Sequence, residues 1–226
     1  MHITPIAYFH SPFSSKFGVP RQSGVAPGVE GRIVFTEQFA NPDALRGLDQ
    51  FDRLWIIWAF SQNVDAEKHA LVRPPRLGGN EHMGVWATRS SFRPNNLALS
   101  CVKIKEIIAE PKRCEIVVLG ADLMNGTPIY DIKPYLPSTD AHPDASGGFT
   151  DTTPWKPLEV QFDAPIPHDL TAAQIEALTQ VLAQDPRPHY HNDPTREYGM
   201  PFYHYDIKFR VPSPTTLLVT AFSRLP

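Results

Sequence analysis

The stretch "DRLWIIWAF", residues 52–60, holds the longest apolar run of the chain, seven residues from Leu54 onward. The run is far too short to cross a membrane, because a membrane-spanning helix needs about 20 apolar residues. Its tryptophans and isoleucines are typical of a β-strand. Because no polar residue interrupts the run, we predict that this strand is buried on both faces.

Similar strand-like segments lie on either side of this run and are separated by turns that contain proline or glycine. We predict strands at 3–9, 31–35, 54–60, 84–88, 97–104, 115–119 and 129–132. The 226 residues include 24 prolines and 13 glycines, which favours short elements with fixed turns over a helical bundle. Together these features predict a mainly β fold, built as a barrel or a tightly curled sheet.

The C-terminal part of the chain contains one well-marked helix. Thr171 and Gln174 form the pattern of a capping box, in which each side chain serves the other residue's free backbone N–H. Ile175, Leu178 and Leu182 then fall on one helical face, and the proline after Asp185 ends the helix.

Two further strand-like segments, 203–211 and 216–222, predict a hairpin after this helix. Between His142 and Pro167 acids, prolines and glycines accumulate and periodicity fades. We therefore predict a β-barrel domain over 1–145, a linker over 146–166 and a small α+β domain over 167–226.

The charge of the chain is unevenly distributed. The net charge is −3, but the segment 68–105 contains seven basic residues and one acid, Glu81, and so carries +6. A local patch of this kind suits a phosphate-bearing partner. An ordinary solvated face balanced by acidic residues elsewhere would give the same pattern.

The start of the sequence shows neither the basic region nor the long apolar run of a secretory signal. We therefore expect a cytoplasmic protein without a membrane segment, in which Cys101 and Cys114 are reduced thiols.

Three polar loops contain the residues that could bind a ligand. "GVWATRSSFRPNN", residues 84–96, places Arg89 directly after a predicted strand and Arg93 on a rigid turn, where guanidinium groups can hold a carboxylate or phosphate. "SPFSSKFGVPRQSG", residues 11–24, adds Lys16, Arg21 and Gln22. The third loop, "DLMNGTPIYD", contains Asp122, Asn125, Thr127 and Asp131 around a hairpin-like Asn-Gly turn. Structural ion pairs and ordinary turns would explain these residues equally well.

The sequence contains none of the common nucleophile, nucleotide-loop or paired-cysteine signatures. His189, His191 and Asp193 alternate and could line an extended segment as metal ligands, but their neighbours are turn-rich and unpatterned. Together with Arg187, His189 and Tyr190 could instead stack and pair with RNA. We predict no metal site.

The loop sequences, taken together, resemble the TsaA-like, or TrmO, family of tRNA (adenine-N6)-methyltransferases. The matching segments are "SPFSSKFGVPRQSG", "DRLWIIWAF", "RPPRLGGNEHMGVWATRSSFRPNN", "NGTPIYDIKPYLPSTD" and "DPRPHY". The first four lie in family order over residues 11–140, and the last lies in the C-terminal unit. The resemblance implies a single-sheeted β-barrel methyltransferase domain and a small α+β C-terminal domain that contacts tRNA.

The resemblance also implies the ligands and the site. The methyl donor would be S-adenosyl-L-methionine, the acceptor would be threonylcarbamoyl-adenosine at position 37 of threonine tRNA, and the protein would be a homodimer. The residues that it implies for the donor are Pro20, Arg21, Gln22, Ser61, Gln62, Arg89, Leu99, Asn125, Gly126, Thr127 and Pro128. Those expected to face tRNA are Lys16, Arg76, Arg93, Arg187 and Tyr190.

The chain departs from the family pattern at a few positions in these loops. Family members usually have aspartate where this chain has Asn125, and often histidine where it has Ser61. They also differ at Ser91, Asn96 and Ala98.

The proton that leaves N6 needs an acceptor, for which Asp131 and His82 are candidates, although each could instead have a structural role. Two alternatives remain open: an RNA-binding barrel without catalysis, and a methyltransferase that acts on another RNA or on a small molecule.

Overall fold

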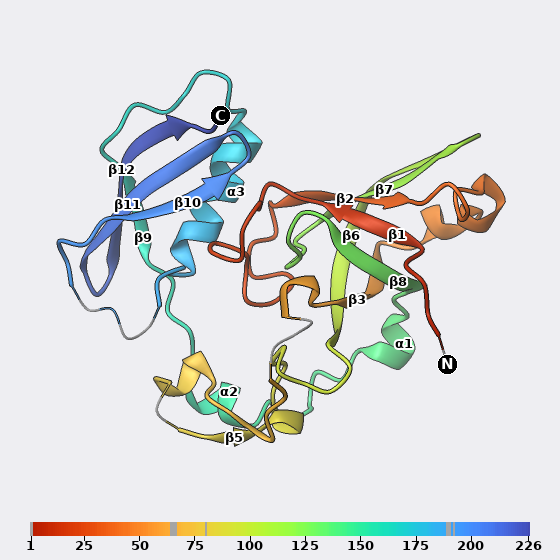
Figure 1. The fold of residues 1–226 in the computed structure, drawn as a ribbon, viewed down its shortest axis with the longest axis horizontal. Helices are drawn as coiled ribbons and strands as arrows, with labels where there is room; N and C mark the ends of the chain where they lie inside the picture. The colour runs from red at the N-terminus through yellow and green to blue at the C-terminus, as the bar shows by residue number, and fades with distance from the viewer. Residues whose placement is uncertain (1, 64–66, 80, 189–190, 192) are drawn as a thin grey trace.

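The computed structural model describes all residues except 1, 64–66, 80, 189–190 and 192. Figure 1 shows a barrel and a smaller sheet with one long helix, separated by the loop that follows the first strand. This arrangement confirms the predicted fold class, a mainly β barrel with a small C-terminal α+β unit.

Six antiparallel strands form the closed barrel in the order β1-β2-β7-β6-β3-β8. Their bounds are β1 Ala7–His10, β2 Glu30–Phe35, β3 Arg53–Ala59, β6 Leu97–Glu110, β7 Arg113–Leu119 and β8 Thr127–Pro134. Each overlaps one of the predicted strands. Their inward-facing side chains, such as Phe9, Ile33, Ile116 and Ile129, fill the barrel as one core.

The prediction that residues 54–60 are buried on both faces is wrong. Along β3, Leu54, Ile56 and Trp58 are buried, whereas Trp55 and Ile57 between them are partly exposed. In a closed single sheet one face points into the barrel core and the other faces outward, so large apolar residues can occupy both faces while only one is fully buried.

The predicted strand at 84–88 is also wrong over most of its length. β5 is Met83–Gly84 and pairs only with β4, Leu71–Val72, and the next three residues form the 3-10 turn η5, Val85–Ala87. The barrel is closed by its six strands, so this segment has no edge with which to pair. It lies in the long connection from β3 to β6, which extends away from the barrel beside α2, Phe149–Thr152 (Figure 1).

Four 3-10 turns lie in the connections between barrel strands: η1 Pro42–Leu45, η2 Leu48–Gln50, η3 Ser61–Asn63 and η4 Pro75–Leu77. The single-turn helix α1, Pro137–Asp140, follows the last barrel strand, β8. Cys101 and Cys114, on neighbouring barrel strands, are both free thiols.

The C-terminal unit is a four-stranded sheet packed against one helix. Its strand order is β10-β11-β12-β9, with β9 Glu159–Phe162, β10 Tyr198–Phe202, β11 Tyr205–Ser213 and β12 Thr216–Arg224. The predicted hairpin is confirmed as β11 and β12. β9 lies in the segment predicted as a linker but pairs in parallel with β12, so this part of the segment is a strand of the C-terminal sheet.

The helix α3, Ala172–Ala183, begins as predicted with a capping box between Thr171 and Gln174. Leu178 and Leu182 are fully buried against the sheet. The same core contains Phe13, Ala26 and Val29 from the loop between β1 and β2. That loop therefore belongs structurally to both units.

Candidate functional site

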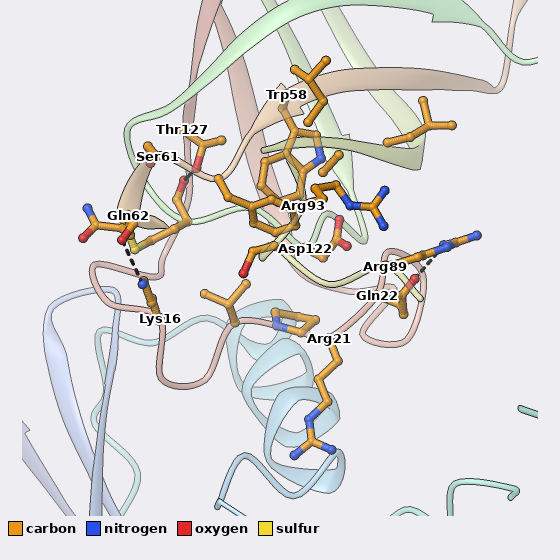
Figure 2. A pocket seen from close by; sticks show the side chains of 18 of the residues that line it. Lys16, Arg21, Gln22, Trp58, Ser61, Gln62, Arg89, Arg93, Asp122 and Thr127 are labelled. Atoms are coloured by element: carbon orange, nitrogen blue, oxygen red, sulfur yellow. Dashed lines mark hydrogen bonds between the residues drawn. The ribbon is translucent and has the colours of Figure 1, made fainter. Parts of the chain in front are cut away.

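A cavity of about 690 Å³ opens at one end of the barrel. Because neighbouring strands are antiparallel, the end of β3 and the beginnings of β6 and β8 lie at the same edge. The loop between β1 and β2, the turn after β3 and the segment before β6 surround this edge (Figure 2). The volume lies within the range that small-molecule sites occupy.

The cavity brings together segments from all three loops in which the sequence predicted binding residues. The predicted residues that line it are Lys16, Pro20, Arg21, Gln22, Ser61, Gln62, Arg89, Arg93, Leu99 and Thr127. Positions 16 and 127 are far apart in the sequence, and the barrel places them at one opening.

Other predicted residues do not line the cavity: His82, Asp131, Arg76, Arg187, Asn125, Gly126 and Pro128. Asp131 forms an ion pair with Lys133 at 3.0 Å, and exposed His82 accepts a hydrogen bond from Arg73 Nε at 3.1 Å. Neither proposed proton acceptor therefore reaches the cavity. Tyr190 lies outside the described residues.

One wall of the cavity is apolar and aromatic. Trp58 and Phe60 meet edge to face, with their ring centroids 4.6 Å apart, and Leu97 and Met124 lie beside them. A wall of this kind suits a flat ring such as a nucleobase. From the apolar lining the sequence prediction included only Pro20 and Leu99, because an apolar residue at a strand end looks the same whether it packs in the core or faces a ligand.

The cationic side chains around the cavity have different roles. Arg89 is exposed, and its Nη1 donates to Gln22 Oε1 at 2.6 Å, which links two of the predicted loops. Lys16 Nζ donates to the carbonyl of Gln62 at 3.1 Å. Arg93, in contrast, uses its guanidinium to hold its own loop, by donating to the carbonyls of Ser90, Val85 and Thr88.

Asp122 was named from the sequence in the third polar loop but was given no role in the predicted site. It follows β7, lines the cavity and is partly buried. Ser100 Oγ donates to Asp122 Oδ1 at 2.5 Å, and Trp58 Nε1 donates to Ser100 Oγ at 2.9 Å. Burial raises the pKa of Asp122, and this effect outweighs the hydrogen bond from Ser100 and the charge of Arg89, which lower it. The sequence signal for this residue was a carboxylate three positions after a strand with a buried core.

Arg21 joins the cavity to the C-terminal unit. Its guanidinium is turned toward the end of α3 (Figure 2), where Nη2 donates to the carbonyl of Asp185 at 3.1 Å and contacts that of Arg187 at 3.5 Å. It also lies over the Trp155 ring, 4.6 Å from the centroid. Arg187 is largely buried and pairs with the Asp185 carboxylate through two hydrogen bonds of 2.8 Å. The turn 185–188, "DPRP", is thus a connector between the two units.

Two family models match this chain, one for each unit. The tRNA-methyltransferase O N-terminal domain matches residues 8–141 and the TrmO C-terminal domain matches residues 155–224. The chain belongs to the TrmO family. The first match includes every residue that lines the cavity, and the second includes α3 and β9 to β12.

Individual TrmO-family relatives agree over nearly the whole chain. The tRNA (adenine(37)-N6)-methyltransferase of Escherichia coli is 39% identical over 215 residues, which cover 91% of each chain. A putative S-adenosylmethionine-dependent methyltransferase, RcsF, of Pseudomonas aeruginosa is 36% identical over 96% of this chain and 95% of its own. The crystal structure of TrmO from Pseudomonas aeruginosa superposes with a TM-score of 0.77 at 30% identity, and covers 99% of this chain and 98% of that one.

Two features are absent from the part of this TrmO-family chain that the structure describes. In it, no helix has both the length and the apolar character needed to span a membrane. The described residues also contain no group of three or more His, Cys, Asp or Glu side chains that could hold a metal ion. His189, one of the three possible metal ligands considered from the sequence, lies outside them.

Proposed function

We propose that the cavity binds S-adenosylmethionine and that this chain, a tRNA (adenine37-N6)-methyltransferase like its relatives, methylates threonylcarbamoyl-adenosine in threonine tRNA. The observation that carries the proposal is the composition of the cavity. It combines an aromatic wall, exposed cations and one carboxylate at the mouth of a barrel of the TrmO family.

The residues present fit the groups of this donor. S-adenosylmethionine has an adenine ring, a ribose, a carboxylate, an ammonium and a sulfonium. The wall formed by Trp58, Phe60 and Leu97 suits the adenine, and the exposed guanidinium of Arg89 suits the carboxylate, which it can hold through two parallel hydrogen bonds. Ser61 and Gln62 supply further polar groups at the rim.

The bound donor supplies a methyl group carried on a positively charged sulfur. The chain contributes by holding the acceptor nitrogen in line with that methyl group inside an apolar-walled cavity. Orientation of this kind can provide on the order of 7–11 kcal/mol of the acceleration. The carbamoyl carbonyl beside N6 also makes the N6 proton more acidic than in plain adenosine.

The acceptor tRNA requires cations outside the cavity as well. Arg76 is exposed on η4, in the segment with a charge of +6, and Lys16 is exposed at the cavity rim. Phosphate groups of the anticodon stem and loop would bind to such residues. Lys16 and Arg76 each donate to a carbonyl as well but are exposed. Arg93 and Arg187 support this role less, because they are partly buried and carbonyls or a carboxylate engage their guanidinium groups.

We also propose that the protein is a homodimer. The connection between β3 and β6 exposes large apolar side chains, namely Trp86 at 74%, Leu71 at 59% and Phe92 at 37%. Leu99 at the cavity is 51% exposed as well. A second copy covering these side chains would remove them from water. Light scattering at micromolar concentration tests this, and a monomer mass would contradict it.

Complementation tests the proposed function. An Escherichia coli strain that lacks its own tRNA (adenine(37)-N6)-methyltransferase would express this chain, and mass spectrometry would quantify the nucleosides of its tRNA. We expect the chain to restore N6-methylated threonylcarbamoyl-adenosine. Unmethylated threonylcarbamoyl-adenosine at the level of the empty-vector strain, with the chain expressed in folded form, would contradict the proposal.

A further inference from the structure

Among the described residues that line the cavity, Asp122 is the one with a carboxylate. The charged residues around it are the cations Lys16, Arg21, Arg89 and Arg93, and no histidine occurs among the described lining residues. A proton that leaves a substrate in this cavity therefore has one side chain that can take it near neutral pH. Guanidinium and ammonium groups are already protonated there.

Asp122 is held in place by a chain of two hydrogen bonds, one buried and one partly buried, whose direction is fixed. The Trp58 indole can only donate, so Ser100 Oγ accepts from it. Ser100, which is 1% exposed, then uses its single proton to donate to Asp122 Oδ1. The backbone N–H groups of Asp122 itself and of Ser23 also lower the pKa of the carboxyl.

These contacts come from three different parts of the fold. Trp58 lies on β3, Ser100 lies on β6, and Ser23 lies in the loop shared by the two units. In Figure 2 Asp122 lies between Trp58 and this loop, in the middle of the lining. The carboxylate is therefore fixed by the barrel and is not a mobile surface group.

The electrostatic surroundings of Asp122 suit proton transfer. Burial raises its pKa above the ordinary aspartate value, against the opposing effects of Ser100, the two backbone N–H groups and the charge of Arg89. A general base becomes more effective as its pKa approaches the working pH, provided that it stays ionised there.

We propose that Asp122 is the proton acceptor of the methyl transfer and that Ser100 positions it. This inference rests on the proposed function. The N6 lone pair forms the new bond to the methyl carbon as the carbon–sulfur bond breaks, and the electron pair of that bond goes to sulfur. The N6–H bond then breaks, its electron pair stays on nitrogen, and the proton goes to the Asp122 carboxylate. Water at the open side of the cavity receives the proton afterwards.

Asp122→Asn is the first test, because the amide keeps the shape of the side chain and can still accept from Ser100. We expect the single-turnover rate on tRNA to fall by about 100-fold or more, since general bases typically contribute 10²–10⁴. The dissociation constants of S-adenosylmethionine and tRNA should stay within about threefold of wild type. Asp131→Asn removes the exposed carboxylate of the Lys133 ion pair and should leave the rate unchanged.

Ser100→Ala tests the positioning role through pH. The hydrogen bond from Ser100 lowers the pKa of Asp122, so its loss should move the acidic limb of the rate profile to higher pH. A readout independent of activity is the carboxyl titration of Asp122 by carbon NMR in the free protein, assigned by its absence in Asp122→Asn. We expect a pKa above that of an ordinary aspartate, and a further rise in Ser100→Ala.

The outcomes separate the inference from the proposed function. A wild-type protein that does not methylate tRNA overturns the proposed function, and the inference falls with it. An active wild type with a fully active Asp122→Asn variant overturns the inference alone. A loss in Asp122→Asn that lies entirely in S-adenosylmethionine affinity also overturns it, because Asp122 would then be a donor-binding group.

Discussion

Arg89 is the cavity residue whose charge is best placed to hold a ligand carboxylate. Its side chain is exposed at the rim, and the Gln22 amide orients one edge of the guanidinium. The guanidinium of Arg93, four residues later, donates its hydrogen bonds to carbonyls of its own loop. The same residue type thus has a position that suits ligand binding at Arg89 and a structural role at Arg93, although both lie in one loop.

We predict that Arg89→Ala weakens S-adenosylmethionine binding by about ten-fold or more and leaves the melting temperature nearly unchanged. A hydrogen bond to a charged group contributes about 1.5–3 kcal/mol, and removing an exposed side chain costs little stability. Isothermal titration calorimetry measures the affinity. The control is Arg46→Ala, which removes an equally charged, exposed side chain far from the cavity. Equal affinities for both variants would remove Arg89 from the donor site.

Asn125 stands where family members usually have aspartate, and its contacts explain why the fold tolerates the amide. Its Oδ1 accepts a hydrogen bond from the backbone N–H of Ser11 at 3.2 Å, and its own N–H donates to the Phe13 carbonyl at 2.9 Å. An aspartate would accept from Ser11 equally well. The residue therefore ties two loops together, a role that the amide fills without the missing charge.

At the scale of elements, the loop between β1 and β2 connects the cavity to the C-terminal core. Phe13 packs against Phe202 with ring centroids 5.8 Å apart, and Phe17 stacks on Phe209. Gly18 directly follows Phe17 in this loop. It has a φ of +94° and lies directly against Met200, which is fully buried. A side chain at this position would therefore be strained by the backbone and would overlap the Met200 thioether.

We predict that Gly18→Ala lowers the free energy of unfolding by about 1–3 kcal/mol more than Gly24→Ala does. Both glycines lie in this loop and have positive φ, but a Cβ at Gly24 would meet nothing within 4 Å. The difference therefore isolates the overlap with Met200, and overpacking typically costs this amount. Chemical denaturation measures both values. Equal losses for the two variants would show that the loop is not packed on β10.

The sequence predicts the positions of the barrel strands well. It predicts poorly which side chains are buried and which segments pair outside the barrel. Six strands, the helix α3 and the final hairpin were found because turn residues and apolar patterns mark them locally. The errors at β3, at 84–88 and at β9 concern pairing and burial, which depend on neighbours that are distant in sequence. Asp122 was named but given no role for the same reason, since its significance comes from Ser100 and Trp58, 22 and 64 residues away.

For the molecule as a whole, the central feature is the contact between the two units at the turn 185–188. Within this turn the guanidinium of Arg187 neutralises the carboxylate of Asp185. The Asp185 carbonyl accepts a hydrogen bond from Arg21, which lies in the loop between β1 and β2. The resemblance to the family implied that Arg187 belongs to the tRNA-facing C-terminal unit, and an RNA contact of Arg187 stays a prediction. In the structure its guanidinium pairs with the carboxylate of Asp185, two residues away.

We predict that Arg187→Ala weakens S-adenosylmethionine binding and lowers the free energy of unfolding by about 1–3 kcal/mol. The substitution leaves the mostly buried carboxylate of Asp185 without its cation. The turn 185–188 then becomes less rigid, and its carbonyls hold the guanidinium of Arg21 less firmly. Calorimetry and thermal denaturation measure these effects. The control is Arg196→Ala, which removes the arginine above the Tyr198 ring of the same unit. Unchanged donor affinity and stability together with weak tRNA binding would instead support the RNA-facing role.

We propose that the barrel-mouth cavity carries out methyl transfer to tRNA. The most direct test of this role is mass spectrometry of tRNA nucleosides after incubation of the purified protein with S-adenosylmethionine that carries a deuterated methyl group. We predict that the labelled methyl group appears on N6 of threonylcarbamoyl-adenosine. The absence of label from every tRNA nucleoside, with a protein that binds the donor, would contradict the claim.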